Sequence, residues 1–132
     1  MKTLIISFVL ILFFVACQKE ENDLLKFRFG TYYGIRYSNY ENVGINRLDT
    51  ITVNFEVVKY NYSGTHTLDY GSGNYYILND SIGFNDENAR ITLYSWEWIL
   101  SGMYKYKLTG DSLFLFRNNK TLNISYRLKR IK

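Results

Sequence analysis

Strict alternation of apolar and polar residues, repeated in several runs, constrains this chain more than any other feature of its sequence. Apolar residues at every second position predict a strand with one buried face, because successive side chains of a strand point to opposite sides. The runs have these members on one side: Phe27, Phe29, Thr31, Tyr33, Ile35 and Tyr37; Ile51, Val53, Phe55 and Val57; Tyr104, Tyr106 and Leu108; Leu122, Ile124, Tyr126 and Leu128. In the first run, the other side has Arg28, Gly30, Tyr32, Gly34 and Arg36.

Composition agrees with a strand-rich fold. The chain has 13 Tyr, 9 Phe and no Pro, and aromatic and β-branched residues favour strands. Residues that tolerate tight turns separate the apolar runs. The expected strands lie near residues 27–38, 49–60, 64–69, 74–79, 81–85, 89–100, 103–109 and 112–117, with 121–131 as a ninth strand or as the closing eighth. No stretch has convincing helical periodicity.

Short connections between consecutive strands favour an antiparallel meander, and closing the meander into a barrel removes its exposed edges. We therefore predict an all-β fold, a small antiparallel up-and-down barrel of about eight strands. Gly30 and Gly34 would allow the sharp bends that a small barrel needs. A β-sandwich is the alternative, although it would more often have long crossover loops and some proline.

The first sixteen residues differ from the rest. Lys2 precedes an apolar run, residues 4–16, that only Ser7 interrupts. A membrane span needs roughly 17–25 apolar residues, so this run fits the apolar region of a signal peptide better. It ends in Phe14-Val15-Ala16-Cys17, which resembles a bacterial lipobox. The resemblance implies that residues 1–16 are a lipoprotein signal peptide and that lipid is attached to Cys17. A buried core cysteine is the alternative, but Cys17 lies where an apolar run meets a polar one.

The next residues, Gln18, Lys19, Glu20 and Glu21, resemble the export signal that follows the cysteine of Bacteroidetes lipoproteins. This resemblance implies a lipid-anchored protein of the outer membrane that faces the cell exterior. A solvated charged tether is the alternative. The expected organisation is a signal peptide (1–16), a lipidated tether (17–23) and a single barrel domain (24–132). Cys17 is the only cysteine, so we expect no disulfide.

Further segments extend the resemblance across most of the remaining chain. They are Gly30-Thr31-Tyr32, the segment WILSGMYKY at 98–106, Gly110-Asp111-Ser112-Leu113 and Tyr126-Arg127-Leu128-Lys129-Arg130. Together they are similar to the small lipocalin-like lipoproteins of Bacteroidetes. That resemblance implies a lipocalin-like barrel and a function that is usually unassigned.

Residue types that support catalysis are scarce. His66 is the only histidine, and a serine triad would pair it with an acid such as Asp69, yet no nucleophile motif surrounds any serine. Zinc needs more Cys and His ligands than the chain has. Asp80, Asp86 and Glu87 do not have the spacing of an EF-hand, and turns explain them better. A pair of carboxylates for glycoside cleavage would need a deep groove in a small domain. We therefore expect that the protein is not an enzyme and that it binds no metal and no cofactor.

The formal net charge of +4 is unevenly distributed. Residues 103–132 have eight basic residues and one acid, whereas residues 17–102 have seven basic and eleven acidic residues. A basic stripe first suggests nucleic acid, which a surface-anchored lipoprotein rarely meets. The expected partners are the membrane, through the lipid on Cys17, and an anionic glycan, lipopolysaccharide or an acidic protein. A solvated outer face of the last strands is the alternative.

Two groups of side chains are candidate sites. Trp96 and Trp98 share a strand face, and they and Tyr32 are either core residues or contacts for a sugar or an apolar ligand. Thr50, Ser81 and Ser112 each follow Asp and precede an aliphatic residue, a motif for O-glycosylation in exported Bacteroidetes proteins. The same residues are ordinary turn formers.

Two function classes remain. The first is a non-enzymatic binding or interaction module with a packed barrel, and the second is a barrel that holds a small apolar or glycan ligand at its mouth. A polar or glycine-lined interior would favour the ligand-binding barrel. An interior filled with Phe, Leu and Tyr would favour the interaction module.

Overall fold

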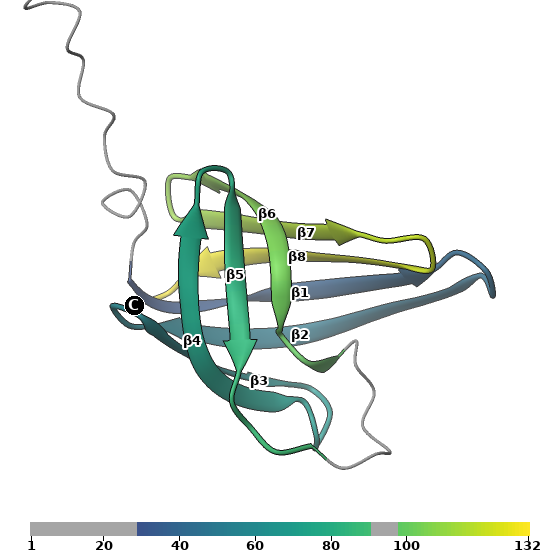
Figure 1. Ribbon diagram of the computed structural model, residues 1–132, viewed down its shortest axis with the longest axis horizontal. Helices are drawn as coiled ribbons and strands as arrows, with labels where there is room; N and C mark the ends of the chain where they lie inside the picture. The colour runs from purple at the N-terminus through teal and green to yellow at the C-terminus, as the bar shows by residue number, and fades with distance from the viewer. Residues whose placement is uncertain (1–28, 91–97) are drawn as a thin grey trace, which may run out of the picture.

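In a computed structural model, which describes residues 29–90 and 98–132, the chain forms a closed barrel of eight antiparallel strands (Figure 1). The strands are β1 (Gly30–Tyr40), β2 (Ile45–Phe55), β3 (Lys59–Gly64), β4 (Tyr70–Leu78), β5 (Ser81–Asp86), β6 (Gly102–Thr109), β7 (Ser112–Asn118) and β8 (Leu122–Arg130). Each strand pairs with the next, and β8 pairs with β1. The prediction of an all-β, lipocalin-like up-and-down barrel is confirmed, and the β-sandwich is ruled out. None of the described residues forms a helix long and apolar enough to cross a membrane.

Some predicted strand boundaries are wrong. The strand predicted at 49–60 is two strands, β2 and β3, because the chain turns at residues 56–58, where the backbone N–H of Glu56 donates to the carbonyl of Lys59 at 2.8 Å. The turn leaves Val57 exposed rather than buried. Most of the strand predicted at 64–69 is the β3–β4 turn. Of the strand predicted at 89–100, the described residues 89–90 and 98–100 are not strand. Residues 121–131 contain the closing eighth strand.

In β1, the side that turns into the barrel is the less apolar one. Tyr32 and Arg36 are fully buried, whereas Tyr33, Ile35 and Tyr37 lie on the outside. The close contact with β8 contributes to this arrangement, since a Cβ on Gly34 would lie 1.9 Å from the carbonyl oxygen of Arg127. Only glycine permits so close a backbone approach.

Aromatic rings fill much of the interior. They form edge-to-face contacts across the barrel, including Tyr32–Phe55 at 5.6 Å, Phe55–Tyr75 at 5.3 Å, Tyr60–Phe84 at 4.9 Å, Phe84–Tyr104 at 5.8 Å and Tyr104–Tyr126 at 5.6 Å between ring centroids. Each such pair contributes about 0.5–1.5 kcal/mol beyond the burial of its area. Leu113, Leu115 and Leu128 complete the core from β7 and β8. A packed core of Phe, Leu and Tyr is the arrangement that favours an interaction module.

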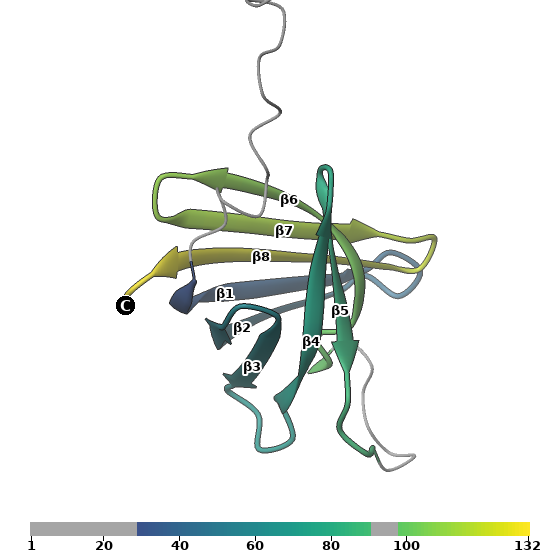
Figure 2. The ribbon, with the colours of Figure 1, turned by 60° about the vertical axis from the view of Figure 1, so that its left-hand side comes forward.

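The two ends of the barrel differ (Figures 1 and 2). At the termini end, the N–H of Thr31 donates to the carbonyl of Lys132 at 2.9 Å, and Nε of Arg130 donates to the carbonyl of Phe29 at 2.9 Å. The turns at this end, 56–58, 79–80 and 110–111, are short. The opposite end, which we call the loop end, has the turns 41–44, 65–69 and 119–121 and the longer connection 87–101. The longest connection therefore lies opposite the point where residue 29 begins the barrel.

Candidate functional site

The loop end holds a buried network of charges around Arg36. Its Nη1 donates to Oδ1 of Asp69 at 2.9 Å and its Nη2 donates to Oδ2 of Asp69 at 2.8 Å. Nη2 also donates to Oδ2 of Asp49 at 3.0 Å. The side chains of Arg36 and Asp69 have no exposed surface, so this is a two-point ion pair inside the barrel.

Backbone contacts position Asp69. It follows the β3–β4 turn, where its N–H donates to the carbonyl of His66 at 2.9 Å and its carbonyl accepts from the N–H of Gly64 at 2.6 Å. A Cβ on Gly64 would lie 1.7 Å from Oδ2 of Asp69. The absence of a side chain at Gly64 therefore makes room for the carboxylate that binds Arg36.

The surroundings of Arg36 keep it charged. Burial alone would lower its pKa, but the hydrogen bonds to Asp69 and Asp49 and the charge of Asp69 outweigh burial, and the pKa is raised. Burial raises the pKa of Asp69, and the hydrogen bond from Arg36 acts in the opposite direction. Because Arg36 binds both Asp49 and Asp69, the network joins β1, β2 and the β3–β4 turn.

His66 and Trp98 form the more accessible part of the loop end. The His66 ring stacks on the Trp98 ring with centroids 4.9 Å apart and an interplanar angle of 21°. Nε2 of His66 is 3.0 Å from Oδ1 of Asp49. The acid beside the His66 ring is therefore Asp49, not Asp69 as the triad hypothesis supposed. Arg36 binds both carboxylate oxygens of Asp69 but only Oδ2 of Asp49, so Oδ1 of Asp49 is left for His66. Within residues 29–90 and 98–132, His66 forms no hydrogen bond to a serine or threonine hydroxyl.

The predicted ligand contacts lie apart. Tyr32 belongs to the core, packed edge-to-face on Phe55 and fully buried, so a ligand on the barrel surface does not reach it. Trp98 is half-buried at the loop end. Trp96 lies outside the described residues, as do Cys17, Gln18, Lys19, Glu20 and Glu21.

The three candidate glycosylation residues have different surroundings. Thr50 is exposed, and its hydroxyl lies 2.9 Å from that of Thr65. Ser81 is half-buried and donates to Asp80 at 3.0 Å. Ser112 is half-buried at the start of β7, paired with Thr109 and Lys129. Modification of these hydroxyls stays a prediction.

The three acids that might have suggested calcium have separate partners. Asp80 accepts from Nζ of Lys105 at 2.7 Å, and Asp86 accepts from Tyr62 at 3.2 Å and also binds Arg90. Glu87 accepts from the amide of Asn74. In the described ranges, no group of three or more His, Cys, Asp or Glu side chains could hold a metal ion.

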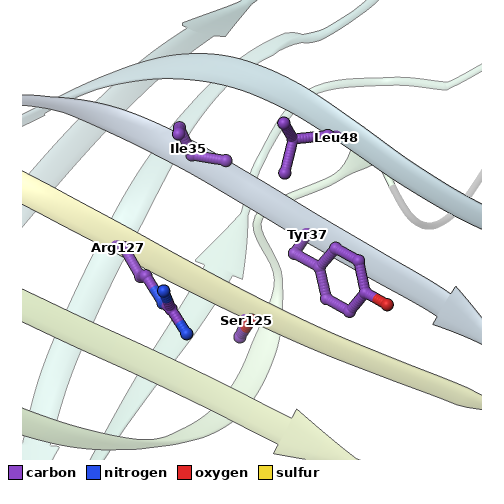
Figure 3. A pocket seen from close by; sticks show the side chains of 5 residues that line it. All are labelled: Ile35, Tyr37, Leu48, Ser125 and Arg127. Atoms are coloured by element: carbon purple, nitrogen blue, oxygen red, sulfur yellow. The ribbon is translucent and has the colours of Figure 1, made fainter.

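A hollow of about 250 Å³ lies on the outside of the barrel. Figure 3 shows its lining: Ile35 and Tyr37 from β1, Leu48 from β2, and Ser125 and Arg127 from β8. Sequence reasoning missed this site, because these residues meet only when the last strand closes on the first. Its one sequence signal was the alternation that separates apolar from basic residues in these strands.

No family model, no curated protein and no solved structure matches this chain. Its function must therefore follow from its own residues: the charge network, the packed interior and the outer surface of the strands.

Proposed function

We propose that this chain is a lipid-anchored protein on the outside of a bacterial outer membrane, a non-enzymatic module that binds an anionic partner through the outer surface of a packed barrel. One observation carries the proposal. Aromatic rings fill the core, while exposed apolar side chains and basic side chains share the outer surface of β8 and β1. Such a chain resembles the small lipocalin-like lipoproteins of Bacteroidetes.

The anchor follows from the sequence around Cys17. Lipid on that residue would join the membrane to the termini end through residues 18–28, because residue 29 begins the barrel there. Two or three acyl chains hold a protein almost irreversibly, whereas one holds it weakly. With such an anchor, the loop end and the outer strand surfaces stay available to a partner.

Intact mass of protein purified from its native membrane, with protease treatment of whole cells, tests this proposal. A chain that begins at Cys17, has the mass of two or three acyl groups and is removed by external protease supports it. Cys17→Ser should abolish the added mass and release the protein from the membrane. An unprocessed or unacylated native chain would overturn the anchor, and an acylated chain that is protected in intact cells would overturn the outward orientation.

A small ligand at the loop end is a second candidate function, and the stacked pair His66 and Trp98 favours it. The indole of Trp98 is half-buried, His66 stacks on it, and the Arg47 guanidinium lies over its ring at 6.0 Å from the centroid. Aromatic rings beside a cation suit a sugar ring or an apolar ligand. Titration with monosaccharides and fatty acids, followed by tryptophan fluorescence, tests this candidate. A saturable change that Trp98→Phe removes and Tyr33→Phe retains would support it. The absence of any saturable change with both ligand classes would count against it.

A further inference from the structure

Five neighbouring strands present an outer surface without acids. In barrel order they are β6, β7, β8, β1 and β2 (Figure 2). Four of them contain no Asp or Glu, and the one acid of β2, Asp49, is held by the buried Arg36. The surface formed by their outward side chains, here called the basic apolar face, consists of Lys107, Phe114, Phe116, Ser125, Arg127, Lys129, Tyr33, Ile35, Tyr37 and Leu48.

The cations of this face have no partner among the residues that the structure describes. Lys107, Arg127 and Lys129 form no ion pair and no side-chain hydrogen bond with any residue in the described ranges. Lys105 also points outward from β6, across from Phe116, but it differs from these three because it binds Asp80 at 2.7 Å. Three unopposed positive charges on one side of a barrel create a local field that attracts anions.

Apolar side chains lie between these cations. Across the sheet, Arg127 lies between Ile35 of β1 and Phe114 of β7, and Phe114 lies between Arg127 and Lys107. Ile35 and Phe114 are 40% and 39% exposed, Phe116 is 45% exposed and Leu48 is 68% exposed. Contiguous exposed apolar side chains are typical of interaction sites, and here they adjoin cations.

We propose that the basic apolar face lies on an anionic lipid surface. Arg127, Lys129 and Lys107 bind the headgroup phosphates, while Phe114, Phe116 and Ile35 contact the boundary between headgroups and acyl chains. This inference rests on the proposed function and deepens it, because it names the anionic partner as the membrane to which the chain is anchored.

The side chains favour lipid over other anions. Phe, Ile and Leu gain most from an apolar phase, which a polysaccharide does not offer. Mobile headgroups can also reach cations on two separate strands, β6 and β8, without a fixed matching pattern. The hollow beside Arg127, lined by Ile35, Leu48 and Tyr37 (Figure 3), combines a phosphate-binding guanidinium with an apolar floor.

The chain before the barrel is long enough for this orientation. From Cys17 to Phe29 there are twelve steps of chain, which span at most roughly 40 Å. Phe29 and β1 share the termini end with Lys129. A lipid on Cys17 and the basic apolar face can therefore contact one membrane together, and the anchor raises the effective concentration of the face at the lipid surface.

Vesicle sedimentation of residues 18–132 tests the inference. This part of the chain contains every strand of the closed barrel and its core, and it lacks both lipid and the apolar N-terminal run. The vesicles are phosphatidylcholine with or without phosphatidylglycerol. We expect binding only to the anionic vesicles, with a loss of binding as salt increases.

Matched variants locate the binding surface. Lys107→Gln, Arg127→Gln and Lys129→Gln should each weaken vesicle binding roughly fivefold. Lys59→Gln, which removes another exposed lysine, from β3, should leave it unchanged. Phe116→Ser should weaken binding, whereas Leu78→Ser, on the far strand β4, should not. Thermal unfolding of each variant separates weakened binding from lost folding.

The outcomes distinguish the two proposals. The lipid inference would be overturned if Lys59→Gln and Lys129→Gln weakened vesicle binding equally, or if Phe116→Ser left vesicle binding unchanged. Absent vesicle binding, together with binding to a polyuronate or an acidic protein that Arg127→Gln weakens, would overturn the lipid inference and leave the proposed function intact. Absent binding to all three anionic probes would overturn both.

Discussion

Arg36 and Asp69, 33 residues apart in the chain, form a two-point ion pair within the barrel in which neither side chain is exposed. The pair ties β1 to the β3–β4 turn and brings Asp49 of β2 into the same network. An ion pair withdrawn from water is not strongly stabilising by itself, because desolvation offsets most of the attraction. Removing one partner is costly, however, since the other charge stays buried.

Arg36→Met should lower the free energy of unfolding by about 3–5 kcal/mol, because Asp69 is left buried without its partner. Urea denaturation at neutral pH measures the change. Arg36→Met/Asp69→Leu should recover part of the loss, since no unpaired charge is left at these two positions. Lys105→Met, which removes an exposed ion pair with Asp80, should leave stability nearly unchanged. If Arg36→Met were as stable as the parent, the network would have no structural role.

Gly64→Ala should destabilise the barrel by about 1–3 kcal/mol, because the new methyl group overlaps the Asp69 carboxylate and displaces it from Arg36. A double-mutant cycle with Asp69→Ala isolates this cause. Once the carboxylate is absent, Gly64→Ala should cost much less. Equal costs in both backgrounds would mean that backbone strain, and not the Asp69 contact, makes glycine necessary at this position.

The barrel should lose stability at alkaline pH through its buried tyrosines. Burial raises the pKa of Tyr75 from 10.0 to about 12, and it also raises the pKa values of Tyr60, Tyr62, Tyr104 and Tyr126. Their contribution is fully present below pH 10, the ordinary tyrosine value, and is lost as pH rises from there, because the unfolded chain ionises first. Each such tyrosine lowers the free energy of unfolding by about 1.4 kcal/mol per pH unit in this window.

Urea denaturation between pH 8 and about 11, with tyrosinate absorbance in the same samples, measures this dependence. The buried tyrosines should ionise only as the chain unfolds. Tyr75→Phe should make the fall in stability with pH less steep. A stability that does not change across this range would contradict the burial of these hydroxyls.

Tyr60→Phe should cost about 1–3 kcal/mol. The Tyr60 hydroxyl donates to the carbonyl of Leu100 at 2.6 Å, and both residues are buried. Without the Tyr60 hydroxyl, the buried carbonyl of Leu100 loses this hydrogen-bond donor. Thermal unfolding measures this loss. Tyr33→Phe removes a hydroxyl from an exposed position on the outside of β1, so it should have little effect on the melting temperature. Equal melting temperatures for the two variants would contradict the prediction.

The barrel itself could be predicted from local patterns. Alternating runs such as Ile51, Val53 and Phe55 have one apolar side because that side packs against other core residues. The turns between consecutive strands are too short for a parallel crossover, so these strands must pair antiparallel. The disadvantage of open edges predicts closure, and the pairing of β8 with β1 confirms that prediction. The turn at Val57 escaped prediction because β-branched residues continue the strand pattern through it.

The same pattern could not predict which side of β1 faces the barrel interior. Its more apolar side faces outward, since the inward side contains Arg36, whose charge is balanced by Asp49 and Asp69 from other elements. No local signal reveals a partner supplied 33 residues later. The basic apolar face is hidden in sequence for the same reason, because Ile35 meets Arg127 only through closure.

The pairing of β1 with β8 also governs how the chain can fold. Tyr32 pairs with Arg130 and Tyr40 pairs with Leu122, so the first strand has an unpaired edge until nearly the whole chain has been synthesised. Contacts so distant in sequence slow folding, and an open edge invites pairing with other chains. A chain cut before β8 would leave two such edges, on β7 and on β1, and we expect it to aggregate rather than to form a smaller barrel. The closed barrel can therefore form only after β8, the last strand, is available to pair with β1.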